Sequence, residues 1–103
     1  MNESSTGIRN PIEEIGDVIA EYPDTYFAVD AVSSLGGDYV DIDEHGIDVI
    51  FASTQKAFAM PPGLAVCVVS DEAYEREVEK EESSWYGGFR RCIDYYDRKG
   101  QTH

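Results

Sequence analysis

The sequence predicts an α/β fold built on a sheet that contains a parallel pair of strands. Two continuous apolar runs, 47–51 and 64–69, are typical of strands that are covered on both faces. A third apolar run, 26–30, precedes them by enough residues for the crossover that two parallel strands require. With 103 residues, the chain is one domain or part of one, long enough to bury a modest core.

The first predicted element is a helix that begins near Asn10. Asn10 is expected to cap the helix, Pro11 suits its first turn, and Glu13 can complete a pair of reciprocal capping bonds. Pro23 follows the predicted end of the helix. Apolar residues recur at helical spacing between these limits: Ile12, Ile15, Val18, Ile19 and Tyr22.

Strands and turns follow the helix. The predicted strands are 26–30, 47–52 and 64–70, and the glycine-rich stretch 33–46 separates the first two. The link from 52 to 64 contains Pro61-Pro62-Gly63 and leaves little room for a helix, so the third strand is expected to return antiparallel to the second. A last, acidic helix is expected from Asp71 to about Glu82.

The net charge of −13 is extreme for this length. It disfavours nucleic-acid binding, which needs a basic surface. A spread acidic surface with lysine only at positions 56, 80 and 99 suits a halophilic protein, because high salt screens self-repulsion. No apolar run of about 18 residues or signal peptide is visible, and we expect a cytoplasmic protein without a membrane span.

The two cysteines, Cys67 and Cys92, indicate no metal site. They lie 25 positions apart, with no C-x-x-C pattern and no neighbouring pair of histidines. Cys67 stands inside an apolar run and is expected to be a small buried hydrophobe.

Asp30 and Lys56 each follow an apolar run, where a buried strand gives way to a loop. In α/β sheets this edge is where ligands bind. The two residues suit pyridoxal 5'-phosphate, since a lysine amine forms a Schiff base with its aldehyde and a carboxylate keeps its pyridine nitrogen protonated. On spacing alone, a turn-forming aspartate and a solvated surface lysine are the more common explanation of the pattern.

Four ordered motifs extend this pattern over nearly the whole chain. The sequence resembles the class V aminotransferases, specifically the alanine–glyoxylate / serine–pyruvate aminotransferase group. The resemblance implies that residues 1–103 are a partial PLP-binding large domain of the aspartate aminotransferase-like fold, mostly parallel with one antiparallel strand. The motifs are Asn2-Glu3-Ser4-Ser5-Thr6-Gly7, Asp30-Ala31-Val32-Ser33-Ser34-Leu35-Gly36-Gly37, Ser53-Thr54-Gln55-Lys56-Ala57 and Pro61-Pro62-Gly63-Leu64-Ala65.

The resemblance implies two catalytic residues. Lys56 matches the lysine that binds the cofactor and then moves the proton of the substrate Cα, and Asp30 matches the partner of the pyridinium nitrogen. Val32 matches the residue that packs on the ring face, although an ordinary core position explains it equally well.

Three further cofactor contacts are implied. Ser4 matches a hydroxyl near the phenolic oxygen of the cofactor, with Ser5 and Thr6 as competing candidates. Gln55 matches an amide that reaches the phosphate, and it argues against cysteine desulfurases, which resemble this chain but usually carry histidine there. Gln101 lies where a side chain would reach the phosphate in the neighbouring subunit of a homodimer.

The function implied is transamination between alanine or serine and glyoxylate or pyruvate, by a protein of which this chain is a middle part. The phosphate-binding glycine loop and the arginine for the substrate carboxylate are expected outside these residues, so the chain alone is expected to be inactive. Two alternatives stay open: another class V enzyme of lyase type, and a non-catalytic truncated or split-gene product.

Overall fold

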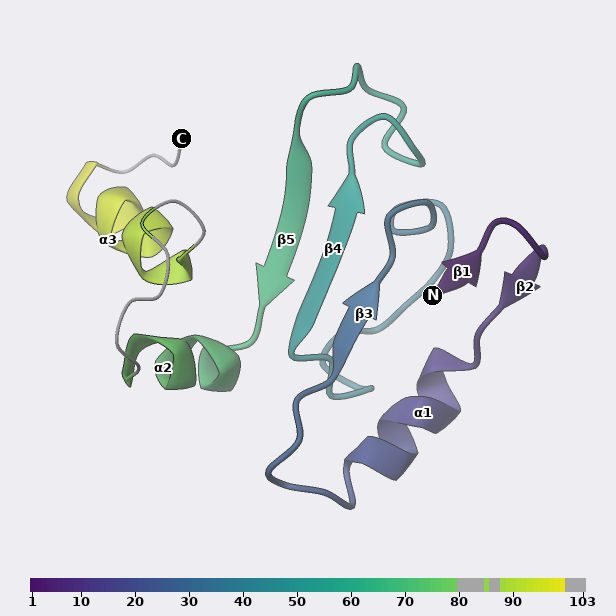
Figure 1. The fold of residues 1–103 in the computed structure, drawn as a ribbon, viewed down its shortest axis with the longest axis horizontal. Helices are drawn as coiled ribbons and strands as arrows, with labels where there is room; N and C mark the ends of the chain where they lie inside the picture. Colours follow the sequence, from purple (N-terminus) through teal and green to yellow (C-terminus); the bar gives the residue numbers. More distant parts are fainter. Residues whose placement is uncertain (80–84, 86–87, 100–103) are drawn as a thin grey trace. The chain divides into compact units, whose positions relative to one another are not determined.

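The computed structural model describes residues 1–79, 85 and 88–99. The chain divides into two compact units, Met1–Ser70 and Asp71–His103. The first unit carries the sheet and the residues of interest, and the second carries two helices (Figure 1).

The first unit is built on a three-stranded sheet in the order β3-β4-β5. β3 (Ala28–Asp30) and β4 (Val49–Ser53) are parallel, with Val29 opposite Ile50. β5 (Ala65–Val69) runs antiparallel to β4. Both pairings predicted from the lengths of the connections are confirmed.

A cluster of apolar side chains joins the sheet to α1 (Ile12–Ile19). Ile50 is fully buried at its centre, and Val29 and Ile12 are almost as deeply buried. Burial of one such side chain contributes about 1.5–3 kcal/mol to folding. This cluster fixes the position of β3 and β4, whose carboxyl ends lead into the loops of interest.

The prediction that Asn10 caps α1 is wrong. Pro11 occupies the N-cap position without a side-chain hydrogen bond, and the Asn10 amide nitrogen instead donates to the carbonyl oxygen of Met1 at 3.1 Å. Glu13 bonds Arg9 rather than completing a capping pair. Partners in the preceding hairpin segment therefore take both side chains away from the helix terminus.

The expectation that the strands are covered on both faces is also wrong for this chain. β4 alternates between buried and exposed residues, and β5 is largely exposed, with Val68 41% exposed. Cys67 is exposed as well, so it is not the buried hydrophobe that its apolar surroundings predicted. Apolar sequence indicates a strand that can be covered, but burial requires a second layer against each face.

At the amino end of β4, Asp48 holds three segments together. Its carboxylate accepts the backbone N–H of Phe27 at 2.8 Å and the hydroxyl of Ser70 at 3.0 Å. Its own backbone N–H donates to Phe27, and its carbonyl oxygen accepts the N–H of Ser70. One residue thus joins the approach to β3 and the end of β5.

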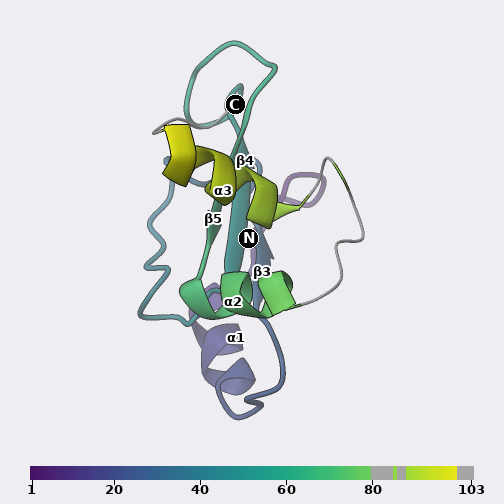
Figure 2. The same cartoon turned by 90° about the vertical axis from the view of Figure 1, so that its left-hand side faces the viewer.

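Elements that the sequence patterns did not predict complete the chain. β1 (Asn2–Glu3) and β2 (Ile8–Arg9) form a short antiparallel hairpin, and α3 (Phe89–Lys99) lies in the second unit with α2 (Asp71–Glu79) (Figure 2). The Arg90 backbone N–H donates to Glu77 at 3.2 Å, which joins the two helices. The predicted end of the acidic helix, Glu82, lies outside the described residues.

Candidate active site

Asp30 and Lys56 come from loops at the same end of the sheet. Because β3 and β4 are parallel, their carboxyl ends point to the same edge of the sheet (Figure 1). Asp30 lies opposite Phe51 in the strand register. Asp30 ends β3, and Lys56 lies three residues after the end of β4. Both side chains are exposed.

The carboxylate of Asp30 is oriented by the turn that follows β3. Its Oδ1 accepts the backbone N–H of Val32 at 2.9 Å, and the Ser34 N–H donates to Ala31 at 3.0 Å. Within the described part of the chain, the second carboxylate oxygen has no hydrogen-bond partner. The aspartate is therefore held in place with one oxygen available to another donor.

The loop that carries Lys56 is closed around Thr54. The Thr54 hydroxyl is shared between the carbonyl oxygens of Pro61 at 3.0 Å and Leu64 at 3.1 Å, and the side chain is only 4% exposed. The Lys56 N–H donates to Ser53, and the Lys56 carbonyl oxygen accepts the N–H of Ala59. These bonds define the backbone at Lys56 while its side chain extends into solvent.

Asp30 and Lys56 do not bond each other. Among residues 1–79, 85 and 88–99, no hydrogen bond or ion pair joins the two side chains. The carboxylate and the amine therefore share one edge of the sheet and are both available to a third group.

The three hydroxyl side chains in the turn of the β1–β2 hairpin differ in their hydrogen bonds. Glu3 accepts the Ser5 hydroxyl at 2.6 Å and the Ser5 backbone N–H at 2.9 Å, and these bonds lower the pKa of Glu3. The Thr6 hydroxyl lies 3.5 Å from the carbonyl oxygen of Glu3. Ser4 is exposed and has no such contact in the described structure, which favours Ser4 over its two neighbours as a ligand-binding hydroxyl.

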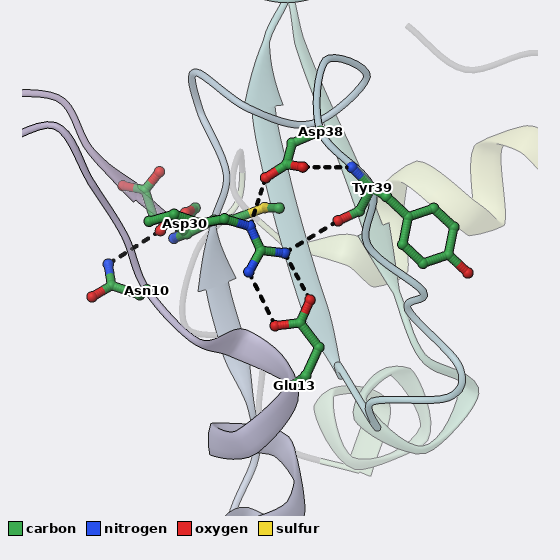
Figure 3. A network of polar contacts seen from close by, with 7 residues as sticks. Asn10, Glu13, Asp30, Asp38 and Tyr39 are labelled. Carbon is green, nitrogen blue, oxygen red and sulfur yellow. Dashed lines mark hydrogen bonds and ion pairs between the residues drawn. The ribbon is translucent and has the colours of Figure 1, made fainter.

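Arg9 ties the hairpin to the loop after β3 (Figure 3). Its guanidinium donates to the Asp38 carboxylate at 2.7 Å and forms bidentate hydrogen bonds with the Glu13 carboxylate at 2.7 and 3.2 Å. The Arg9 hydrogen bond is the main cause that lowers the pKa of Glu13 to about 2. The same contacts, that with Glu13 first, raise the pKa of Arg9 above its usual range.

The structure describes two of the other three expected cofactor contacts. Gln55 is exposed beside Lys56, and Val32 is half-buried in the turn after Asp30. Gln101 lies outside the described residues. The structure thus brings four of the expected residues to one end of the sheet: Asp30, Val32, Gln55 and Lys56. The Met1 nitrogen donates to the carbonyl oxygen of Asp30 and so connects the hairpin that carries Ser4 to this end of the sheet.

Sequence reasoning missed Thr54 and Arg9, which hold these segments in place. Thr54 directly follows a predicted strand, and a buried hydroxyl before a Pro-Pro-Gly turn is a signal for a loop-closing bond. Among the partners of Arg9, Glu13 lies only four positions away, whereas Asp38 and Tyr39 lie 29 and 30 positions away, and no local pattern identifies those two.

The described part of the chain contains no group of three or more histidine, cysteine, aspartate or glutamate side chains that could hold a metal ion. None of its helices is long and apolar enough to cross a membrane.

Comparison with known proteins places this geometry in a family. Residues 1–102 match the protein-family model that is described as "Aminotransferase class-V". The chain belongs to the class V aminotransferases. An uncharacterized aminotransferase of Methanocaldococcus jannaschii is 46% identical over 102 residues, which is 98% of this chain and 26% of that protein.

Two further members have named activities. The alanine–glyoxylate aminotransferase of Oryctolagus cuniculus is 41% identical over 71 residues, 69% of this chain and 18% of that enzyme. The crystal structure of an alanine–glyoxylate aminotransferase from Nostoc sp. superposes with a TM-score of 0.86 at 30% identity, covering 98% of this chain and 27% of that one. The chain is thus an α/β fragment of the fold-type I aminotransferases and spans about a quarter or less of these relatives.

The class V aminotransferases depend on pyridoxal phosphate, and the side chains present fit this cofactor. The pyridine nitrogen, the aldehyde and the phenolic oxygen of the cofactor require a carboxylate, an amine and a hydroxyl donor. Groups of these kinds are present on Asp30, Lys56 and Ser4, and within the described residues neither the Lys56 amine nor the Ser4 hydroxyl has a hydrogen-bond partner.

Proposed function

We propose that residues 1–103 form part of the large domain of a transaminase that moves an amino group between alanine or serine and glyoxylate or pyruvate. The observation that carries the proposal is the exposure of Asp30 and Lys56 on adjacent parallel strand ends, with neither side chain engaged by the other. Likeness to two enzymes named for alanine and glyoxylate supports the choice of substrates.

The residues have separate roles in this proposal. Pyridoxal phosphate supplies an aldehyde that condenses with amines and a ring that accepts the electrons released at the substrate Cα. Lys56 would hold the cofactor through Nζ, and its free amine would serve as the base for the substrate Cα proton. Asp30 holds a proton on the pyridine nitrogen through its free carboxylate oxygen.

The remaining side chains position the cofactor. Ser4 donates to the phenolic oxygen, Gln55 reaches the phosphate, and Val32 lies against the ring. In the proposed homodimer, Gln101 contributes to the phosphate site of the neighbouring subunit. The glycine loop and the arginine expected for the substrate carboxylate are supplied by other parts of the protein.

The first test is the site of cofactor attachment. The protein that contains this chain is incubated with pyridoxal phosphate, reduced with borohydride and mapped by peptide mass spectrometry. Lys56 should carry the label, whereas Lys80 and Lys99 serve as internal comparators for nonspecific reaction. The matched variant Lys56→Arg, which keeps the charge, should remove the label, and a label confined to Lys80 or Lys99 would refute the assignment.

The second test addresses Asp30 and the reaction. Asp30→Asn should retain the reducible attachment at Lys56 but slow alanine–glyoxylate turnover by on the order of 10²-fold, because a neutral amide does not hold the ring proton. An unchanged rate would show that Asp30 is not the ring partner. If the wild-type protein eliminates a substituent from amino acids and transfers no amino group, the lyase alternative replaces transamination.

A further inference from the structure

The turn after β3 and the turn after β4 touch at a point where there is no room for a side chain. A Cβ built on Gly37 would lie 2.9 Å from the Cβ of Ala57, a separation that real Cβ atoms essentially never show. Beside it, a Cβ on Gly36 would lie 3.5 Å from the ring of Phe58. Ala57 and Phe58 directly follow Lys56, so the contact bears on the loop that carries the amine.

Each turn is closed by its own backbone hydrogen bonds. On the β3 side, the Ser34 carbonyl oxygen accepts the N–H groups of Gly37 at 2.8 Å and Asp38 at 2.9 Å. The Ser34 backbone N–H donates in turn to the carbonyl oxygen of Ala31, the residue that follows Asp30. Together with the closed loop around Thr54, these bonds make the contact a junction between two defined turns.

The lack of room for a Cβ atom, and not the backbone conformation, explains the glycine at position 37. Gly36 has φ +88°, a left-handed conformation that favours glycine whatever surrounds it, whereas Gly37 does not adopt a left-handed φ. An alanine at position 37 therefore suffers no backbone strain of that kind. It would instead push Ala57 away by at least about half an ångström to reach ordinary carbon–carbon contact.

We propose that Gly37 is a positioning residue for Lys56: its missing side chain lets the lysine turn seat against the aspartate turn and sets the separation between amine and carboxylate. The inference rests on the proposed function, because it matters only if Asp30 and Lys56 serve one cofactor. A misplacement of about 1 Å in a catalytic arrangement can cost on the order of 10²-fold in rate.

The test is a steric double-mutant cycle in the protein that contains this chain. Gly37→Ala introduces the clash, and Ala57→Gly removes the atom that it meets. With Gly37→Ala, we expect reductive labelling of Lys56 by pyridoxal phosphate to slow about tenfold or more, and the pH midpoint of the bound cofactor's absorbance to shift. The double variant should return both readouts to within about twofold of the wild type.

Gly16 provides a matched control. A Cβ on Gly16 would lie 2.5 Å from the backbone carbonyl oxygen of His45, so Gly16→Ala introduces a closer clash than Gly37→Ala, at a place in α1 away from Lys56. It should lower the urea midpoint without changing the absorbance midpoint or the labelling rate of the folded protein. This comparison separates a positioning effect from a general loss of stability.

The outcomes are distinct. Wild-type values for folded Gly37→Ala, or a double variant that is not restored, would overturn the inference. If Gly37→Ala does not fold, Ala57→Gly alone decides, because it loosens the contact without a clash: labelling about threefold slower supports the inference, and the wild-type rate overturns it. Absence of Lys56 labelling in the wild type instead refutes the proposed function.

Discussion

The loops that carry Asp30 and Lys56 are held differently from the hairpin that carries Ser4. The two loops rely on backbone bonds, the buried Thr54 hydroxyl and the close contact of Gly37 with Ala57. The hairpin relies on Arg9, whose side chain is 40% exposed, and on the equally accessible carboxylates that it contacts. Salt screens exposed charges but leaves packing and buried bonds largely unaffected, so the two parts should respond differently to solvent.

The largest effect is expected from the buried hydroxyl. Thr54→Val keeps the volume but removes the hydroxyl donor of Pro61 and leaves the Leu64 carbonyl oxygen with only the Thr54 backbone N–H, at a cost of about 0.5–1.5 kcal/mol. Urea unfolding at low and high potassium chloride should give nearly the same loss. Thr54→Ser keeps the hydroxyl but loses the methyl group, and it should lose less stability than Thr54→Val, so equal losses in the two variants would contradict the role of the bond.

A smaller and salt-dependent effect is expected at Arg9. Arg9→Gln removes the contacts with Glu13 and Asp38, and the urea midpoint should fall at low salt and approach the wild type at high salt. Arg98→Gln is the matched control, because it removes the same charge from a looser pair with Asp94 at 3.6 Å. A salt-independent loss would show that Arg9 acts through packing of its aliphatic stem.

The pH dependence of the hairpin follows from Glu13. Its pKa falls from 4.5 to about 2 on folding, so the unfolded state binds more protons between these values. The stabilisation is present above about pH 4.5 and is lost as the pH falls toward 2. Acid unfolding of Glu13→Gln should lack this component, and identical acid profiles for variant and wild type would contradict the assignment.

The smallest change is expected at Ala59, in the lysine loop. Ala59 has φ +52°, a left-handed conformation that costs a residue with a Cβ about 1–2 kcal/mol. Glycine relieves this cost but loses about 0.5–1 kcal/mol of chain entropy, so Ala59→Gly should be slightly stabilising. Ala20→Gly, at φ −58°, is the control and should be destabilising; a loss of stability in both would refute the argument.

The sequence predicted the strand pairing because connection lengths and a Pro-Pro-Gly turn constrain it locally. It also predicted which strand ends carry Asp30 and Lys56. It did not predict the hydrogen-bond partner of Asn10, the exposure of Cys67 or the close contact between Gly37 and Ala57. Each of these depends on how another segment of the chain packs in the fold. The helix α3 had a usable signal, since Phe89, Ile93 and Tyr96 recur at helical spacing.

Asp48, at the end of the sheet away from Lys56, has a consequence for folding fidelity. If β3 slipped by one position along β4, every side chain of the strand would change face. The slip would also remove the bond from Phe27 to Asp48 at one end and misalign Gly37 with Ala57 at the other. A misregistered chain therefore loses contacts at both ends of the sheet, and the pairing error that would separate Asp30 from Lys56 is disfavoured by a residue at the opposite end.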